Sequence, residues 1–337
     1  MRKLNILFRI SGGKAVGKEL GYGHIFRSMH LAYFFKKHNI WFLLEDYGGA
    51  KNILNQNGFS NILKLKKESG IDSDIKRTIN VIKNKKIDVL INDTYKASEK
   101  YLKKMKKFTK IVLITDLKKY EYSADLVTSG FIGFKNQKII HNDGRISLLG
   151  PKYQILDHRF STRKNSKNKY DLLVTFGGFD ENNITEIFLE QLIKFRGTIK
   201  SKIIHGPSSQ KTTRIKEIER KFSDYFSLIS FGDMYKEISG AKFGLCSGGI
   251  TTYEFAALGV PFAIISQVKH QTTTAKIWEK NKICINLGIS NKNTGKKISK
   301  YLDKIYSMRH KKNRIYHMGI DGKGGKRVQK EIMKLLG

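Results

Sequence analysis

The sequence predicts an α/β protein made of two Rossmann-like domains, whose parallel sheets face each other across a cleft. Short β-branched runs alternate with longer amphipathic runs in both halves of the chain, a pattern typical of strands joined by crossover helices. A polar, charged run at residues 161–169 interrupts the alternation near mid-chain. Each half also carries one glycine-rich segment between a strand-like and a helix-like run. Two similar domains joined by a linker account for all three observations.

The first half, residues 1–160, is expected to form the N-terminal domain. Its apolar runs are short and rich in Ile, Leu and Val, whereas the runs between them repeat apolar residues with the helical period. Strands are therefore expected at residues 4–8, 40–44, 89–92 and 110–115, and helices at residues 25–37, 71–85 and 98–108.

The second half, residues 170–318, repeats this layout and is expected to form the C-terminal domain. Strands are expected at residues 171–176, 201–205, 227–230, 243–246 and 262–266, and helices at residues 184–194, 212–222, 234–238, 251–258 and 273–279. The chain then continues as a helical stretch from residue 298 to 336 with a glycine-rich break at 319–325, so residues 319–337 form a separate helical segment.

The composition is strongly basic, with 64 Lys and Arg against 29 Asp and Glu and a net charge of +35. Such a charge raises the question of a nucleic-acid partner. The lysines are spread along the whole chain, however, and neither zinc-finger spacing nor an aromatic-studded RNA-binding strand occurs. Solvated lysine-rich faces are therefore favoured over a nucleic-acid surface, and weak peripheral attraction to an anionic membrane stays open.

Cysteine usage and hydropathy predict a soluble, cytoplasmic protein, which we expect to be a monomer. Two cysteines, Cys246 and Cys284, fit a reducing compartment and exclude a disulfide scaffold. The apolar start of the chain is interrupted at Arg9 before it reaches the length of a signal peptide. The most apolar stretch, residues 243–265, contains Glu254 and several glycines and does not predict a membrane span.

The two glycine-rich segments, residues 21–27 and 247–254, are the most informative part of the sequence. Each follows a predicted strand and opens a predicted helix, so each offers backbone N–H groups and a positive helix end to an anion. Ligands of open parallel sheets bind at the carboxyl ends of the strands. One segment supplies His24 and the other supplies Glu254. This combination predicts a nucleotide-sugar site.

The chain resembles the nucleotide-sugar hydrolases of pseudaminic acid biosynthesis, which remove UDP from UDP-2,4-diacetamido-2,4,6-trideoxy-β-L-altropyranose. That family has the GT-B fold and is related to the peptidoglycan UDP-N-acetylglucosamine transferase. The similarity runs along nearly the whole chain, and it is the order and spacing of the motifs that carries it. The matching segments are residues 8–9, 21–27, 92–95, 114–116, 149–153, 176–180, 247–254, 259–261, 321–324 and 327–328.

Two departures from the family pattern bear on the substrate. The family usually has an aspartate directly after the strand arginine, where this chain has Ile10, and its following loop is shorter than residues 11–20. The family also tends to have Asn-Gln where this chain has His270 and Gln271. Both positions lie near the expected sugar pocket, so a different sugar stays open.

The resemblance assigns His24 the role of catalytic base and places Tyr95 in the catalytic site beside the sugar, with Arg9 as a sugar contact. Hydrolysis of a glycosyl phosphate needs a base that takes a proton as water attacks the anomeric carbon. A neutral imidazole at the start of a helix suits this role, because the positive helix end disfavours the imidazolium. The alternatives are a histidine that merely caps a loop and a tyrosine buried in the core.

The segment at residues 247–254 is expected to hold UDP. Glycine allows the backbone to approach the diphosphate, and threonine adds hydroxyl donors. Glu254 lies one helical turn further on and is expected to accept hydrogen bonds from the ribose hydroxyls. The alternative is a glycine-rich turn that only permits close helix–strand packing. The expected UDP-binding residues are Gly248, Gly249, Ile250, Thr251, Thr252 and Glu254.

Further substrate contacts are expected near the sugar and the diphosphate. For the glycines that follow the first strand of the second half, a simple strand-to-helix turn is the alternative. No Asp-x-Asp pair accompanies these segments, so neither a metal nor a cofactor is expected, and helix ends would stabilise the leaving group. These further residues are Gly21, Gly23, Arg27, Gly177, Gly178, His270 and Gln271.

These observations lead to the hypothesis of a metal-independent UDP-sugar hydrolase. Water activated by His24 would attack the anomeric carbon with inversion and release UDP and a free diacetamido-trideoxy-type sugar, in the biosynthesis of a pseudaminic-like nonulosonic acid. One alternative is a GT-B glycosyltransferase, in which an acceptor hydroxyl replaces water. Another is a non-enzymatic protein that binds nucleotides or polyanions, which the charge of +35 suggests.

Overall fold

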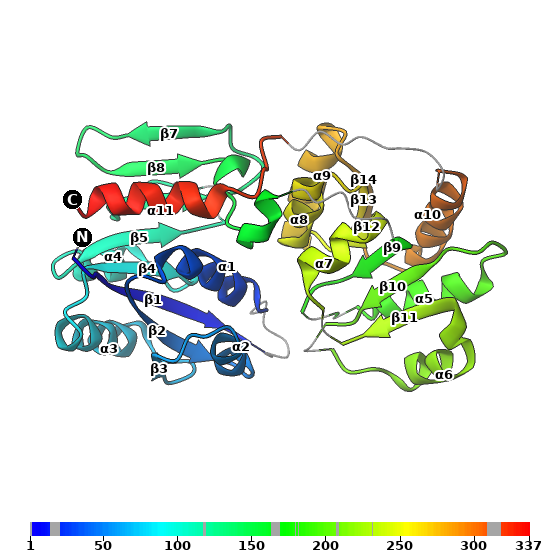
Figure 1. Ribbon diagram of the computed structural model, residues 1–337, viewed down its shortest axis with the longest axis horizontal. Helices are drawn as coiled ribbons and strands as arrows, with labels where there is room; N and C mark the ends of the chain where they lie inside the picture. Colours follow the sequence, from blue (N-terminus) through cyan, green and yellow to red (C-terminus); the bar gives the residue numbers. More distant parts are fainter. Residues whose placement is uncertain are drawn as a thin grey trace. The chain divides into compact units, whose positions relative to one another are not determined.

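The computed structural model describes residues 2–13, 21–116, 119–162, 169–178, 180, 182–206, 209–230, 232–308 and 318–337. These residues form two compact units (Figure 1). The first comprises Met1–His158 together with Gly322–Gly337, and the second comprises Arg159–Asp321. The C-terminal segment therefore packs with the N-terminal part of the chain, although it follows the second unit in sequence.

The first unit contains an eight-stranded sheet of order β3-β2-β1-β4-β5-β6-β8-β7. Its strands are parallel except for the edge strand β7, which runs antiparallel to β8. The strands are β1 (Asn5–Gly12), β2 (Asn39–Asp46), β3 (Ile62–Leu65), β4 (Val89–Asp93), β5 (Lys110–Ile114), β6 (Leu126–Ser129), β7 (Gln137–Ile140) and β8 (Ile146–Leu149).

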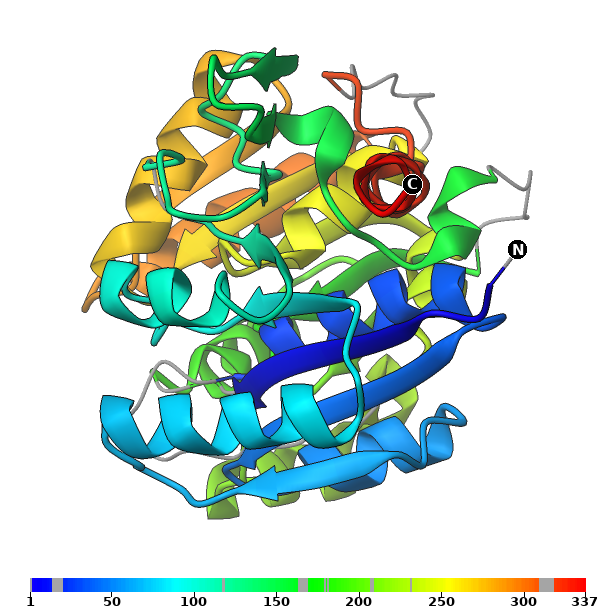
Figure 2. The same ribbon diagram turned by 90° about the vertical axis from the view of Figure 1, so that its left-hand side faces the viewer.

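Helices cover both faces of this sheet, as the nearly continuous burial of β1 requires. Ile6 and Phe8 pack in one core with residues of α1 and α11, whereas Leu7 packs on the other face with residues of α3 and α4. Figure 2 shows α11 end-on, in red, with the C-terminus marked. The helices are α1 (Gly23–Ala32), α2 (Ala50–Gln56), α3 (Ile71–Asn84), α4 (Glu99–Met105) and α11 (Gly324–Leu335).

The second unit contains a six-stranded, fully parallel sheet of order β11-β10-β9-β12-β13-β14. Its strands are β9 (Tyr170–Thr175), β10 (Ser201–Ile204), β11 (Phe226–Ile229), β12 (Ala241–Cys246), β13 (Phe262–Ser266) and β14 (Cys284–Ile289). Its helices are α5 (Ile184–Lys194), α6 (Thr213–Phe222), α7 (Met234–Ser239), α8 (Thr251–Leu258), α9 (Lys269–Lys280) and α10 (Thr294–Met308). α5, α6 and α10 share a core with one face of this sheet.

The prediction of an α/β protein with two Rossmann-like parallel sheets is confirmed. The expected strands and helices are all present, while α2, β3, β6, β7, β8 and β14 add to them. α9 begins at Lys269, earlier than expected, so the predicted contacts His270 and Gln271 lie in its first turn. Of the expected linker, residues 163–168 lie outside the described part of the chain. None of the described helices has both the length and the apolar character that a membrane span needs.

Candidate functional site

The first group of site residues lies where β4 and β5 end and α1 begins. α1 starts at Gly23, and among the described residues its N-cap, Tyr22, makes no side-chain capping hydrogen bond. Among the described residues, no atom comes within 4 Å of a Cβ built on Gly21 or Gly23, so packing does not require glycine at these positions. His24 occupies the first turn and is 8% exposed. Within the described part of the chain, this helix end and the space beside the two glycines offer room for a ligand next to His24.

Asp93, at the end of β4, holds the His24 ring. The Nδ1 atom of His24 lies 2.6 Å from Oδ1 of the fully buried Asp93 carboxylate. Arg27 donates from Nε and Nη2 to the two oxygens of the same carboxylate, at 2.9 and 2.6 Å. A carboxylate this close places the proton on Nδ1, so Nε2 is the ring nitrogen that can accept a proton. This is the arrangement in which an acid residue orients a histidine base.

Arg27 also contacts a second carboxylate. Its Nη1 atom lies 2.5 Å from Oδ1 of Asp116, which follows β5 and whose side chain is 48% exposed. Burial alone would lower the pKa of Arg27, but the charges of Asp116 and Asp93 outweigh it and hold that pKa well above its ordinary value. Burial would likewise raise the pKa of Asp93, yet the charge of Arg27 and the hydrogen bonds from His24 and Arg27 hold it well below its ordinary value.

Tyr95 lies beside His24 in the loop after β4. The ring centroids are 4.7 Å apart and the planes meet at 88°, an edge-on contact. The side chain is a large exposed aromatic, 60% accessible, so it is not the buried core tyrosine of the alternative. The structure thus brings together His24, Arg27 and Tyr95, and adds Asp93 and Asp116 to them.

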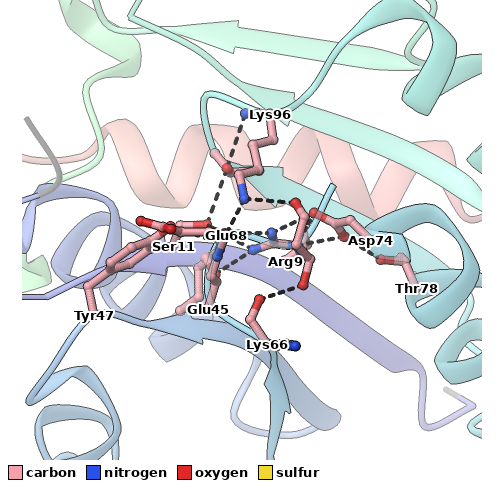
Figure 3. A network of polar contacts seen from close by, with 12 residues as sticks. Arg9, Ser11, Glu45, Tyr47, Lys66, Glu68, Asp74, Thr78 and Lys96 are labelled. Carbon is pink, nitrogen blue, oxygen red and sulfur yellow. Dashed lines mark hydrogen bonds and ion pairs between the residues drawn. The ribbon is translucent and has the colours of Figure 1, made fainter. Parts of the chain in front are cut away.

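Arg9 is the exception, and the expectation that it contacts the sugar is wrong for this structure. It is fully buried beneath the first unit's sheet, where its Nη2 atom donates to Asp74 at 2.6 Å and to Glu45 at 3.1 Å (Figure 3). Burial alone would lower the pKa of Arg9, but the hydrogen bond and charge of Asp74 raise it above its ordinary value. Arg9 lies on the same face of β1 as Leu7, toward α3, so its guanidinium stabilises the core.

Glu45 links this buried network to the loop that carries Tyr95. Its Oε1 atom accepts from Lys96 Nζ at 2.7 Å, and its Oε2 atom accepts from Ser11 Oγ at 2.9 Å (Figure 3). Burial alone would raise the pKa of Glu45, but hydrogen bonds from Lys96, Tyr47 and Ser11 and the charge of Arg9 lower it to about 2. The loop after β4 is thus fixed by Asp93 at one end and by Lys96 at the other. No sequence motif marked Glu45 or Asp74.

The second group of site residues surrounds the N-terminus of α8. Ile250 is the N-cap, and in the described part of the chain it makes no side-chain capping hydrogen bond. Gly249 is exposed, and no described atom lies within 4 Å of a Cβ built there, whereas a Cβ on Gly248 would lie 2.8 Å from Cβ of Gln271. Packing therefore requires glycine at Gly248 but not at Gly249, where the backbone stays accessible to a ligand.

The two threonines of α8 differ in what they can offer. Thr252 is fully buried, and its hydroxyl donates to the carbonyl of Gly249 at 2.8 Å. The expectation that it donates to UDP is therefore wrong for this structure, because its proton serves the helix end. Thr251 opens the helix and is partly exposed. Glu254 lies in the first turn and is 5% exposed.

The neighbouring strand ends are tied to this loop by two glutamines. Gln271, in α9, accepts at Oε1 from the backbone N–H of Gln267 at 2.9 Å and from that of Gly248 at 3.4 Å. Gln267 donates from Nε2 to the carbonyl of Phe176 at 2.7 Å. Gln271 therefore positions the loop through its side-chain oxygen, while His270 beside it is exposed. The carboxyl ends of β9, β12 and β13 meet at this edge.

Gly177 and Gly178 complete the same edge after β9. Gly177 has φ +85°, a conformation that L side chains rarely adopt, and a Cβ on Gly206 would lie 2.1 Å from the Gly177 carbonyl oxygen. The helix that follows, α5, is closed to anions by the Asp180 carboxylate, which accepts from the backbone N–H groups of Ile184 and Thr185 at 2.9 and 2.7 Å. An anion at this edge would therefore be attracted to α8.

Within the described residues, no group of three or more His, Cys, Asp or Glu side chains could hold a metal ion. What the two groups can do follows from their chemistry. The first presents a carboxylate-oriented imidazole next to an exposed aromatic ring. The second presents an uncapped helix end with an open glycine. These are a proton acceptor and an anion-binding backbone.

Sequence comparison relates this chain to known proteins. No model of a known protein family matches it. It is 29% identical over 262 residues to the spore coat polysaccharide biosynthesis protein SpsG of Bacillus subtilis, covering 73% of this chain and 76% of SpsG. It is 27% identical over 274 residues to an uncharacterized protein of Methanocaldococcus jannaschii, covering 74% of this chain and about half, 54%, of that protein. The chain is thus a distant relative of SpsG.

Solved structures similar to this chain extend over its full length. Acinetobacter baumannii MurG superposes with a TM-score of 0.64 at 14% identity, covering 98% of this chain and 99% of MurG. The UDP-GlcNAc 2-epimerase of Neisseria meningitidis, solved bound to UDP-GlcNAc, superposes with a TM-score of 0.59 at 13% identity, covering 98% of this chain and all of the epimerase. At these identities the likeness shows the fold, and it confirms the predicted GT-B class with two Rossmann-like domains.

Proposed function

We propose that this protein processes a UDP-sugar in polysaccharide biosynthesis, and that it is a hydrolase that splits the bond between the sugar and UDP. The contact between His24 and Asp93 carries this proposal, because it leaves Nε2 of an imidazole as a proton acceptor at an uncapped helix end. The distant relationship to SpsG, named for spore coat polysaccharide biosynthesis, supports the pathway class. The epimerase solved with UDP-GlcNAc supports the ligand class.

In the proposed reaction, His24 Nε2 takes a proton from water as the water oxygen attacks the anomeric carbon. The bond from that carbon to the diphosphate oxygen breaks, and its electron pair leaves with UDP. Attack from the face opposite UDP gives a free sugar with inverted configuration. The imidazolium that forms keeps its Nδ1–H directed at Asp93, whose negative charge stabilises it.

UDP is proposed to bind at the start of α8. The backbone N–H groups near Gly249, Ile250 and Thr251 would receive the diphosphate, and the Thr251 hydroxyl would add a donor. Glu254 would accept from the ribose hydroxyls, and Gly177, Gly178 and His270 would line the same strand ends, as the resemblance to the pseudaminic acid hydrolases implies. The proposal requires both groups of residues to act on one substrate molecule. The same resemblance suggests a diacetamido-trideoxy sugar.

Incubation with UDP-sugars in the absence of any acceptor tests the reaction class. A hydrolase releases UDP and free sugar at a rate that water alone supports, and we expect H24A to lose this turnover while it keeps its affinity for UDP in calorimetry. H158A is a suitable control, because His158 stacks on Tyr33 with a side chain 40% exposed and takes no part in the proposed site. An H24A variant that retains turnover would remove the proposed base.

A glycosyltransferase is the second candidate, because the fold that the chain shares with MurG is equally compatible with an acceptor hydroxyl in place of water. A transferase would release little UDP until an acceptor hydroxyl is supplied, so the same assay separates the two. The net charge of +35 also suggests a non-enzymatic binder of nucleotides or polyanions. Calorimetry with UDP and with duplex DNA at rising salt separates that case, because non-specific polyanion binding collapses as salt rises.

A further inference from the structure

We propose that Asp116 is a positioning residue that sets, through Arg27, how readily His24 takes up a proton. This inference rests on the proposed role of His24 as the base. Asp116 touches neither His24 nor the reacting atoms in the proposed mechanism. It acts by compensating the guanidinium that lies between it and the imidazole.

The geometry forms a continuous chain of charges. The Nη1 atom of Arg27 lies 2.5 Å from Asp116, and its Nη2 atom lies 2.6 Å from Asp93. The same Nη2 atom lies 3.2 Å from His24 Nδ1. A guanidinium this close to the ring opposes its protonation, because like charges repel strongly where water is excluded.

Asp116 changes the net charge of the cluster around His24. Arg27 carries one positive charge, and Asp93 and Asp116 carry one negative charge each, so the cluster is net negative while His24 is neutral. Proton uptake by His24 brings the cluster to neutrality. With Asp116 neutralised, Arg27 and Asp93 already cancel, and proton uptake leaves an uncompensated positive charge in a largely buried site. Asp116 therefore favours the imidazolium that the mechanism forms.

Among the described residues, charged groups on the surrounding elements have partners of their own. On β1, Arg9 is paired with Asp74 and Glu45. In the loop after β4, the Lys96 ammonium is paired with Glu45, and the Tyr95 ring meets the His24 ring edge-on. On α11, Arg327 donates to the carbonyl of Lys152, and on α1 itself His30 faces Asp157 at 4.0 Å.

The position of Asp116 also explains why this carboxylate is suited to tuning. Its side chain is 48% exposed, whereas Asp93 is completely buried. A half-exposed carboxylate can lose its charge without leaving an unsatisfied group in the core, so its removal perturbs the electrostatics of the site more than the fold. Asp93, by contrast, holds the ring itself.

The test compares D116N, D116E and the matched control D143N. Asp143 is also an exposed carboxylate, 55% accessible, and it contacts Arg145 at 2.5 Å. It lies in the turn that leads into β8, at the amino ends of the parallel strands, whereas Asp116 lies at their carboxyl ends. The protonation midpoint of His24 is followed by NMR titration of its imidazole, and the acid limb of the kcat/KM profile is followed in parallel. The NMR measurement needs no turnover.

We expect D116N to move both midpoints to lower pH by about one pH unit, the size of a charge effect across an intervening guanidinium. D116E, which keeps the charge, should restore the wild-type midpoint, and D143N should leave it in place. A midpoint that stays fixed or rises in D116N would overturn the proposal and leave Asp116 as a structural anchor for Arg27. A shifted NMR midpoint without any hydrolysis would uphold the electrostatic role and defeat the hydrolase proposal instead.

Discussion

Replacing Asp93 by asparagine is the sharpest test of how the first unit holds the proposed base, His24. The carboxylate is completely buried and accepts from His24, from Arg27 twice and from Ser28 Oγ at 3.2 Å. An amide of the same shape keeps one acceptor but presents N–H donors where the carboxylate presented an oxygen. The tautomer of His24 with its proton on Nδ1 is then no longer strongly favoured, so Nε2 is not always free of a proton and able to accept one.

The size of the effect follows from these contacts. Loss of the correct tautomer in the acid–histidine pair of a serine protease lowers kcat by about 10⁴-fold, and we expect a loss of at least about 10²-fold here. Removing one partner of a buried ion pair costs about 3–5 kcal/mol in unfolding free energy. Since Arg27 keeps Asp116 as a partner, we expect about 3 kcal/mol in D93N.

The stability effect has a predictable pH dependence. The pKa of Asp93 in the folded protein lies below its ordinary value of about 3.9, so its stabilising contribution is complete above roughly pH 4 and is lost as the pH falls through the depressed pKa. The difference in unfolding free energy between wild type and D93N should therefore be largest at neutral pH and shrink in acid. Urea unfolding at several pH values measures it.

D74N is the matched control for D93N. Asp74 is also completely buried and also binds a buried arginine, Arg9, at 2.6 Å, but it lies in the network beneath the sheet. D74N should cost a similar unfolding free energy and leave kcat within a fewfold of wild type. If kcat of D93N stayed within tenfold of wild type while H24A had no measurable turnover, the inference that Asp93 orients His24 for catalysis would be refuted. Equal losses of kcat in D74N and D93N would point to a general loss of structure.

Two further outcomes follow from burial and packing. R9M should lower the unfolding free energy by about 3 kcal/mol, because it leaves Asp74 and Glu45 without their buried cation. The same variant should leave KM for the UDP-sugar unchanged. A raised KM at unchanged stability would instead support a contact between Arg9 and the sugar. G249A should change the unfolding free energy by less than about 0.5 kcal/mol yet weaken UDP binding in calorimetry, and an unaltered UDP affinity would argue against a diphosphate at α8. G206A, by contrast, should destabilise the second unit by about 1–3 kcal/mol, because its Cβ would meet the Gly177 carbonyl.

The sequence predicted best those features that depend on local pattern. α5 and α8 begin and end where the helical period and the flanking turn residues placed them. β6, β7 and β8 have four residues each and were missed, although β10 and β11, which are as short, were predicted. β7 is a largely exposed edge strand with little periodic signal. The return of α11 to the first unit was not predictable either, because its contacts join residues that lie far apart in the chain.

The site shows the same division between local and distant information. His24 and Tyr95 were singled out by their short motifs, and the structure places them in contact. Asp93 and Asp116 lay in segments that matched the family, but their roles depend on Arg27, which only the folded chain brings between them. Arg9 was misassigned because the resemblance to the family made it a sugar contact, and the sequence alone does not show that Asp74 of α3 faces it.

The charge of the whole chain and the charge around His24 have opposite signs, and they act over different distances. The net charge of +35 gives the molecule a positive field that raises the local concentration of an anionic nucleotide, and salt screens this field over about 8 Å at physiological ionic strength. Asp93 is completely buried, so salt hardly reaches it, whereas the half-exposed Asp116 is screened more although it contacts Arg27 directly. In the proposed function, capture of the nucleotide and uptake of the proton would thus be governed by separate groups, and a lysine-rich surface is compatible with a proposed base that needs negative charge beside it.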